Sequence, residues 1–150
     1  MAILSVDDGQ SFGTIVQVLK NVFNSTKTFT MSGCHQIKKN KLAVFFWLAE
    51  KRPEGGWSSP NRNNRWINIP DCDEKSFTQI MLNKTENETY FPKDDHAVFM
   101  RKKDADGKYR FYFYGIFKRQ DVDKNAGICV YKRIGTYLDT DEWKFVEAKI

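Results

Sequence analysis

The spacing of apolar residues predicts one helix near the N-terminus. Residues 12–23 read FGTIVQVLKNVF, with apolar side chains at intervals of three or four positions. These side chains are Phe12, Ile15, Val16, Leu19, Val22 and Phe23. Such spacing places them along one face of an α-helix of about three turns. Asp7, Asp8 and Ser11 precede this face and are the candidate N-caps.

The rest of the chain has the pattern of β-strands. Residues 41–49, KLAVFFWLA, form a continuous apolar run whose two alternating sets of side chains both need cover, so we expect a central strand. Shorter strands are expected at 28–33 (TFTMSG), 66–70 (WINIP) and 128–134 (ICVYKRI). The pattern of residues 71–82 is compatible with either a helix or a strand.

A β-hairpin gives the clearest local signal. AVFMRKK at 97–103 and KYRFYFYGIFK at 108–118 flank the turn sequence DADG. Strict alternation in the second strand assigns its side chains to two faces. One face holds Tyr109, Phe111, Phe113 and Phe117, and the other holds Arg110, Tyr112, Tyr114 and Ile116.

Together these elements predict an α+β fold. One helix and six or seven strands without regular helical crossovers favour a curved, mainly antiparallel sheet or a small β-barrel with flanking helices. Aromatic residues make up 15% of the chain, which suits the pleated, half-buried surfaces of such a fold. The 150 residues contain no internal repeat and no linker, so we expect a single domain over 1–150.

The net charge of +5 is unevenly distributed. Residues 36–65 carry seven bases against two acids, whereas residues 66–100 carry three bases against seven acids. Residues 101–150 carry twelve bases against eight acids. A local excess of positive charge attracts a phosphate polymer, although a solvated basic surface fits the same distribution.

The stretch 52–66, RPEGGWSSPNRNNRW, has the composition of a loop but contains two tryptophans. Aromatic planes stack unpaired bases, amides read base edges, and basic side chains hold phosphates. The predicted base-binding residues are Trp57, Ser58, Asn61, Asn63, Asn64 and Trp66. The predicted phosphate-binding residues are Lys38, Lys39, Lys41, Arg62 and Arg65. Two other interpretations stay open: Trp66 as a core residue and Trp57 as a simple loop anchor.

The segment from Gly55 to Asn87 resembles YTH domains. It reads GGWSSPNRNNRWINIPDCDEKSFTQIMLNKTEN, similar to that family's Gly-x-Trp-Ser motif, basic loop, Arg-Trp-Ile, strand ending in proline and acidic stretch. The preceding TMSGCHQIKKNKLAVFFWLAE resembles the family's strand pair, so the resemblance covers about residues 28–88. YTH domains belong to the PUA-like superfamily with EVE and SRA modules, which are compact barrels that bind RNA or DNA.

This resemblance implies a PUA-like fold with an aromatic cage for a modified or flipped base. Trp57 corresponds to a cage tryptophan, and residues 65–67 correspond to a structural strand start. The chain departs from the YTH pattern at residues 61–63, where that family has another cage tryptophan. The hairpin at 98–118 is similar in pattern to modules beside restriction and mobile-element nucleases. That similarity implies the accessory domain of a larger restriction or defence protein.

Catalytic signatures are absent from the sequence, which has no Walker loop, G-x-G-x-x-G, G-x-S-x-G or H-E-x-x-H motif. We therefore expect a non-catalytic nucleic-acid-binding module with no catalytic residue, cofactor or metal. One alternative is a small metal-free nuclease that pairs His35 and His96 as base and acid. Another is a protein-interaction or inhibitor module whose exposed aromatic residues anchor an interface.

The remaining features concern the cellular compartment. Cys34, Cys72 and Cys129 form no C-x-x-C pair, so a disulfide framework is not expected. The N-terminal residues lack the basic start and apolar stretch of a secretory signal. No apolar run approaches the ~20 residues of a membrane span. We expect a cytoplasmic protein with no membrane partner, and the oligomeric state stays open.

Overall fold

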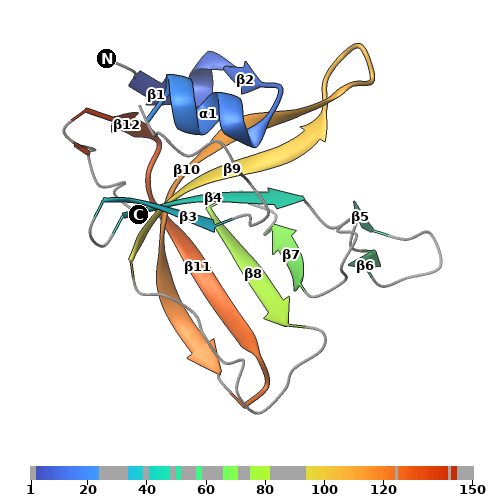
Figure 1. The fold of residues 1–150 in the computed structure, drawn as a ribbon. Helices are drawn as coiled ribbons and strands as arrows, with labels where there is room; N and C mark the ends of the chain where they lie inside the picture. The colour runs from blue at the N-terminus through green and yellow to red at the C-terminus, as the bar shows by residue number, and fades with distance from the viewer. Residues whose placement is uncertain are drawn as a thin grey trace.

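The computed structural model shows a β-rich molecule with one short α-helix in its described part (Figure 1). It describes residues 3–23, 34–38, 41–47, 50–51, 57–58, 66–70, 75–81, 94–123, 125–141 and 143–144. The N-terminal elements are β1 (Ile3–Ser5), the 3-10 helix η1 (Val6–Asp8), β2 (Ser11–Phe12) and α1 (Ile15–Asn21). The later strands are β3 (Cys34–Lys38), β4 (Lys41–Trp47), β5 (Glu50–Lys51), β6 (Trp57–Ser58), β7 (Trp66–Pro70), β8 (Ser76–Met81), β9 (Asp95–Lys103), β10 (Tyr109–Asp123), β11 (Ile128–Gly135) and β12 (Tyr137–Asp139).

The main sheet has the strand order β3-β4-β9-β10-β11-β8-β7, with β2 paired to β10. All of its ladders are antiparallel except that between β4 and β9, which is parallel. No ladder joins β3 to β7 within the described residues, so the sheet is open rather than a closed barrel. The predicted α+β class is confirmed in its curved-sheet form.

Most predicted strands are present. The apolar run at 41–49 contains β4, residues 66–70 are β7, and the hairpin is β9 and β10. The ambiguous segment 71–82 contains strand β8, because residues 76–80 pair with β11 on one side and residues 77–81 pair with β7 on the other. The strand expected at 28–33 lies outside the described residues.

The helix is shorter than its apolar pattern predicts. Phe12 is not helical: it pairs with Phe111 of β10, and α1 begins only after this strand contact. The helix N-cap is Thr14, whose hydroxyl accepts a hydrogen bond from the Gln17 amide at 3.1 Å. Tertiary strand pairing has therefore overridden the local helical periodicity over the first predicted turn.

The three predicted N-caps are consequently wrong. Asp7 and Asp8 lie in η1, whose own N-cap is Ser5. Ser11 lies in β2 and binds Arg110 of the hairpin, which donates to the Ser11 hydroxyl at 2.7 Å. All three side chains precede the helix in sequence, but Asp7 and Asp8 lie before the short strand β2 and Ser11 lies within it, so none of them caps α1.

A β-bulge in β10 reverses the predicted faces of its second half. Phe113 pairs with Phe99 of β9 while Gly115 pairs with Val98, so Tyr114 is an extra residue in β10. After the bulge, Ile116 packs on the same side as Phe111 and Phe113, and Phe117 packs on the opposite side. The prediction that Phe117 shares a face with Phe111 is therefore wrong, because one inserted residue shifts the alternation.

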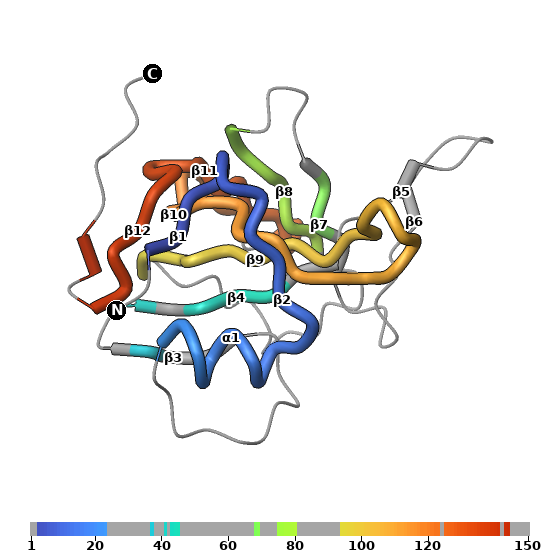
Figure 2. The backbone as a smooth tube through the Cα atoms, turned by 90° about the horizontal axis from the view of Figure 1, so that it is seen from above, coloured from blue at the N-terminus to red at the C-terminus, as the bar shows by residue number. Residues whose placement is uncertain are grey.

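The two faces of the main sheet each bury a separate apolar cluster. The first lies between the sheet and the N-terminal elements, as Figure 2 shows for α1. It contains Leu4, Val18, Leu19, Val22, Ala43, Phe45, Ala97, Phe99, Phe111, Phe113, Ile116, Leu138 and Trp143. The second contains Val44, Phe77, Val98, Met100, Phe117, Cys129 and Tyr131. The expectation that both faces of the central strand need cover is confirmed, since adjacent residues of β4 enter different clusters.

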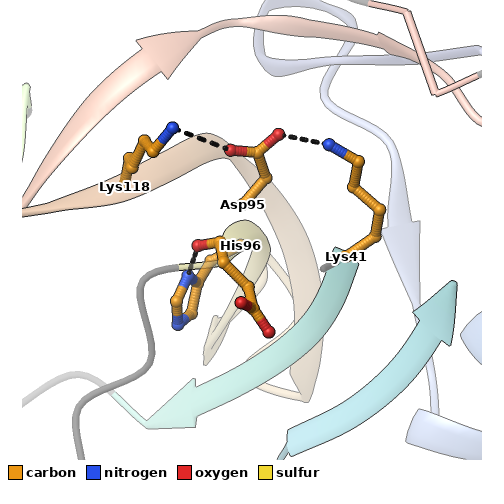
Figure 3. A network of polar contacts seen from close by, with 5 residues as sticks. Lys41, Asp95, His96 and Lys118 are labelled. Atoms are coloured by element: carbon orange, nitrogen blue, oxygen red, sulfur yellow. Dashed lines mark hydrogen bonds and ion pairs between the residues drawn. The ribbon is translucent and has the colours of Figure 1, made fainter. Parts of the chain in front are cut away.

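A histidine lies at the edge of the second cluster. His96 is 3% exposed, and its ring centroid is 4.9 Å from that of Tyr131. Its Nδ1–H donates to the Asp94 carbonyl oxygen at 2.6 Å (Figure 3). Burial lowers the pKa of His96 below its ordinary value of 6.5, against the opposing effects of that hydrogen bond and the neighbouring carboxylates. The folded protein therefore favours neutral His96.

Replacing Gly115 by alanine is expected to destabilise the fold by about 2–5 kcal/mol. The backbone has φ +128° there, and an added Cβ would lie 2.8 Å from the Gly135 carbonyl oxygen. Gly107→Ala is the matched control, because φ is +79° but nothing lies within 4 Å of the added atom. Its expected cost is about 1–2 kcal/mol. Urea unfolding measures both; equal losses would contradict the close-approach argument.

Acidification below pH 6.5 is expected to destabilise the protein through His96. The folded pKa is lowered, so the unfolded chain binds more protons between the folded value and 6.5. The free energy of unfolding then falls with decreasing pH, by at most about 1.4 kcal/mol per pH unit, and is insensitive to this group above that window. Urea unfolding at pH 7.5 and 5 compares wild type with His96→Asn. Identical pH slopes for the two proteins would show that His96 is not responsible.

Candidate functional site

The two tryptophans of the predicted base site stand at the starts of separate short strands. Trp57 and Ser58 form β6, in which Trp57 pairs with Lys51 and Ser58 pairs with Glu50 of β5. Trp66 begins β7. In Figure 1, β5 and β6 lie beyond the end of β4, and β7 lies beneath that end. The backbone thus places both tryptophan positions in one region of the fold.

The segment between these tryptophans holds several of the predicted contacts. Asn61, Asn63 and Asn64 of the base-binding set lie outside the described residues, as do Arg62, Arg65 and Lys39 of the phosphate-binding set. Lys38 is the last residue of β3, and its backbone pairs with that of Lys41 in β4. For these residues the assigned roles stay predictions.

Lys41 is the predicted phosphate ligand whose side chain the structure describes. Its Nζ lies 2.7 Å from one carboxylate oxygen of Asp95, and the Lys118 Nζ lies 3.9 Å from the other oxygen (Figure 3). The Asp95 side chain is only 12% exposed, so the attraction to Lys41 is less screened than at the surface. Lys41 is also the register partner of Asp95 across the parallel ladder. Its charge is therefore partly compensated within the fold.

A hydrogen-bonded pair of amides links β7 and β8 and was not predicted from the sequence. Asn68 is 1% exposed and is the register partner of Gln79 across the β7–β8 ladder. The Gln79 Nε2 donates to the Asn68 Oδ1 at 3.1 Å. Asn68 lies two positions after Trp66, so both backbone positions belong to the same face of the strand. Buried polar groups in proteins are nearly always hydrogen-bonded, and Gln79 is the partner that satisfies Asn68 here.

The sequence contained one signal for this pair. WINIP contains one polar residue in an apolar strand, and the fold buries this residue, Asn68, whereas Ile69 is only half-buried. An asparagine in an otherwise apolar strand indicates a hydrogen-bonded partner inside the protein. The identity of that partner depends on the β7–β8 register, which local sequence does not supply.

The histidines required by a metal-free nuclease are not assembled. His96 is buried and uses its Nδ1–H on a backbone carbonyl. His35 pairs with Ala43 of β4, which pairs with Ala97 of β9, so His35 and Ala97 share one cross-strand row. His96 belongs to the adjacent row. The register therefore does not bring the two histidine positions together.

Other reactive side chains are similarly confined. Burial raises the pKa of the Cys129 thiol above its ordinary value, despite the opposing hydrogen bond from Tyr131, so the thiol form is favoured. Among the described residues no group of three or more His, Cys, Asp and Glu side chains is placed to hold a metal ion. In the same part of the chain, no helix has the length and apolarity needed to cross a membrane.

Comparison with known proteins identifies a family and a small number of similar solved structures. The family model described as SRA, the SET and RING associated domain, matches residues 2–140. The structure described as the 5-hydroxymethylcytosine-specific restriction enzyme AbaSI matches with a TM-score of 0.65 and 22% sequence identity. The match covers 98% of this chain but 44% of that one, so this chain spans less than half of that enzyme's length. No curated protein matches.

These findings agree with the architecture. The likeness to AbaSI shows a shared fold, and the family match extends from β1 to the end of β12. The expected membership of the PUA-like superfamily is confirmed, with SRA as the branch that matches. The chain belongs to the SRA family of PUA-like, DNA-binding modified-base readers.

Proposed function

We propose that this protein is a non-catalytic DNA-binding module that holds one modified base, extruded from the duplex, in a pocket formed around β6 and β7. The observation that carries the proposal is the SRA family match over residues 2–140. Extruding a base from the duplex costs a few kcal/mol of unstacking and unpairing. Stacking and hydrogen bonds between the pocket and the extruded base must offset this cost. The residue types near the starts of β6 and β7 suit both stacking on the base and hydrogen bonding to it.

Stacking is assigned to the tryptophans. Trp57 lies in β6 and Trp66 begins β7, two short strands at one end of the molecule. A base stacked on an aromatic ring gains about 1–3 kcal/mol. Trp57, in the Gly-Trp-Ser segment, is the primary platform in this proposal, and Trp66 is the second.

Reading of the base edge is assigned to amides. Asn61, Asn63 and Asn64 lie in the chain between the tryptophans, and Ser58 follows Trp57. The Asn68–Gln79 pair adds a fixed polar element on β7 and β8. An amide group has more donors and acceptors than one mutual hydrogen bond uses, so this pair has the chemistry to recognise a base edge.

Phosphate binding is assigned to the basic residues around the pocket. Lys38, Lys39, Arg62 and Arg65 belong to the segment with the greatest positive excess. Lys41 contributes less than these four, because its ammonium group is already paired with Asp95. Positive charge at these positions supplies sequence-independent attraction, while the pocket supplies discrimination.

The similarity to a 5-hydroxymethylcytosine-specific restriction enzyme supports a cytosine modified at its C5 position as the recognised base. It also supports a role as the recognition domain of a restriction or defence system, in which cleavage belongs to another domain. We further propose that residues 1–150 form one domain and act in the cytoplasm, where such a system meets foreign DNA.

Trp57→Ala is expected to weaken binding to the preferred duplex by about 10- to 100-fold, which corresponds to the loss of one stacked base. Fluorescence anisotropy measures this with duplexes that carry a single cytosine, 5-methylcytosine or 5-hydroxymethylcytosine. Tyr137→Ala is the matched control, since Tyr137 is a half-exposed aromatic residue of β12. Both variants should retain the circular dichroism spectrum of the wild type. Equal affinity of wild type and Trp57→Ala for every duplex would remove Trp57 from the site.

A further inference from the structure

The outer end of the β9–β10 hairpin is a two-stranded ribbon with no other strand beside it in the described part of the chain. The ladder with β4 ends where Trp47 pairs with Arg101, and β2 pairs only with residues 111–112. Beyond these points β9 and β10 pair only with each other as far as the turn at 104–108. Figure 1 shows this end, hereafter the hairpin tip (residues 101–110), projecting past the main sheet.

The hairpin tip has a well-defined turn. The Asp104 amide donates to the Lys108 carbonyl oxygen at 2.8 Å, and the Gly107 amide donates to the Asp104 carbonyl oxygen at 3.1 Å. The Asp104 carboxylate accepts from the amides of Asp106 and Lys108, each at 2.9 Å. Gly107 supplies the left-handed conformation with φ +79°. The tip is thus preorganised, which lowers the entropic cost of using it for binding.

Arg110 anchors the inner part of the tip to the N-terminal segment. Its Nε donates to the Ser11 hydroxyl at 2.7 Å, and its Nη2 donates to the Ser11 carbonyl oxygen at 3.1 Å. Arg110 is the register partner of Lys102, so this contact holds both strands of the tip against β2. A projecting ribbon that is fixed in this way keeps its direction relative to the sheet.

Cationic side chains lie on both faces of the tip. On one face, the Arg101 guanidinium and the Lys103 ammonium lie 4.6 and 5.4 Å from the Tyr109 ring centroid. On the other face, the Lys102 Nζ lies 4.7 Å from the Tyr112 ring centroid. Lys102 and Lys103 are both exposed. With Lys108 and Arg110, residues 101–110 carry five bases against two acids, a net +3.

Cationic side chains on both faces of the tip favour binding inside a groove of the DNA over binding to one flat side of it. A flat phosphate backbone engages one face of a ribbon, whereas a groove places a phosphate wall on each side. The major groove of B-DNA, about 12 Å wide, admits a two-stranded β-ribbon, while the minor groove is only about 6 Å wide. We propose that the hairpin tip is a second DNA contact, separate from the base pocket, that enters the major groove of the duplex. The inference rests on the proposed function only in taking DNA as the polymer.

The position of the tip suits this role. Trp47 ends β4 opposite Arg101, and the chain then continues to β5 and β6, which carries Trp57. Figure 1 shows the tip on the same side of the molecule as β5 and β6. A duplex held at the tip is therefore on the correct side of the molecule to present a base to the pocket. The tip supplies affinity, and the pocket supplies discrimination.

The test compares two variants that remove the same charge. Lys102→Gln/Lys103→Gln/Lys108→Gln neutralises the tip, and Lys20→Gln/Lys118→Gln/Lys132→Gln removes three lysines from α1 and from the far halves of β10 and β11. Anisotropy with a short unmodified duplex over a range of salt concentrations gives the slope of log K against log salt. Each lost phosphate contact reduces this slope by about 0.9, so the tip variant should lose about 2 to 3. The control variant should retain the wild-type slope.

A footprint tests the groove itself. Guanine N7 lies in the major groove, so wild type should protect guanines beside the site from dimethyl sulfate, and the tip variant should not. Equal loss of slope in the two variants, or protection that persists in the tip variant, would overturn the inference. Circular dichroism spectra and unfolding midpoints of both variants confirm that each is folded.

The outcome is separable from that of the base pocket. If wild type shows no preference for a modified base but the tip variant still loses slope and protection, the pocket proposal fails and the tip contact stands. If the tip variant keeps the wild-type salt dependence of log K and wild type prefers a modified base, the proposed tip contact is wrong and the proposed base pocket is supported. When both hold, the tip variant should lose affinity for modified and unmodified duplexes by the same factor.

Discussion

The structure depends on the close approach of β10 and β11 at Gly115 and Gly135. At this point the backbone of β10 leaves no room for a Cβ against the Gly135 carbonyl oxygen. The bulge at Tyr114, next to the positive φ of Gly115, shifts the alternation of side chains along β10, so that Phe113 and Ile116 enter the first apolar cluster while Phe117 enters the second. The first half pairs with β9 and the second with β11. Without this extra residue, strict alternation would place Ile116 on the face of the second cluster and Phe117 on the face of the first.

Local sequence was sufficient to predict those elements whose conformation depends on their own side chains. The apolar run of β4, the alternation of β9 and β10, and the Asp/Gly turn between them identified these elements correctly. The alternation failed at Gly115, and a lone glycine inside a strand pattern is itself a signal for a bulge. The helix start failed for a different reason: Phe12 pairs with Phe111, almost a hundred residues away, and no local pattern encodes that contact.

The site shows the same division between local and long-range information. Composition led to the choice of Trp57, Trp66 and the basic excess around them, because aromatic and charged residues are conspicuous in a loop, and their roles stay predictions. It missed Asn68 and Gln79, whose significance comes from burial and from the β7–β8 register. It also grouped Lys41 with the phosphate ligands, although Asp95, which compensates its charge, lies on a strand 54 residues later in the sequence. Strand pairing brings distant side chains together, and these contacts determine which charged and polar groups are left to bind a ligand.

The parallel pairing of β4 and β9 has a consequence for how this domain diversifies. Two parallel neighbours cannot be joined by a tight turn, so the chain between them must leave the sheet and return. Here the return path, residues 48–94, includes β5 to β8 and the tryptophan-bearing stretch. Both ends of the path are clamped by the same ladder, and lengthening a closed loop costs little additional entropy. Under the proposed function, insertions and substitutions in this path would change which base is accepted without changing the β4–β9 ladder that closes it.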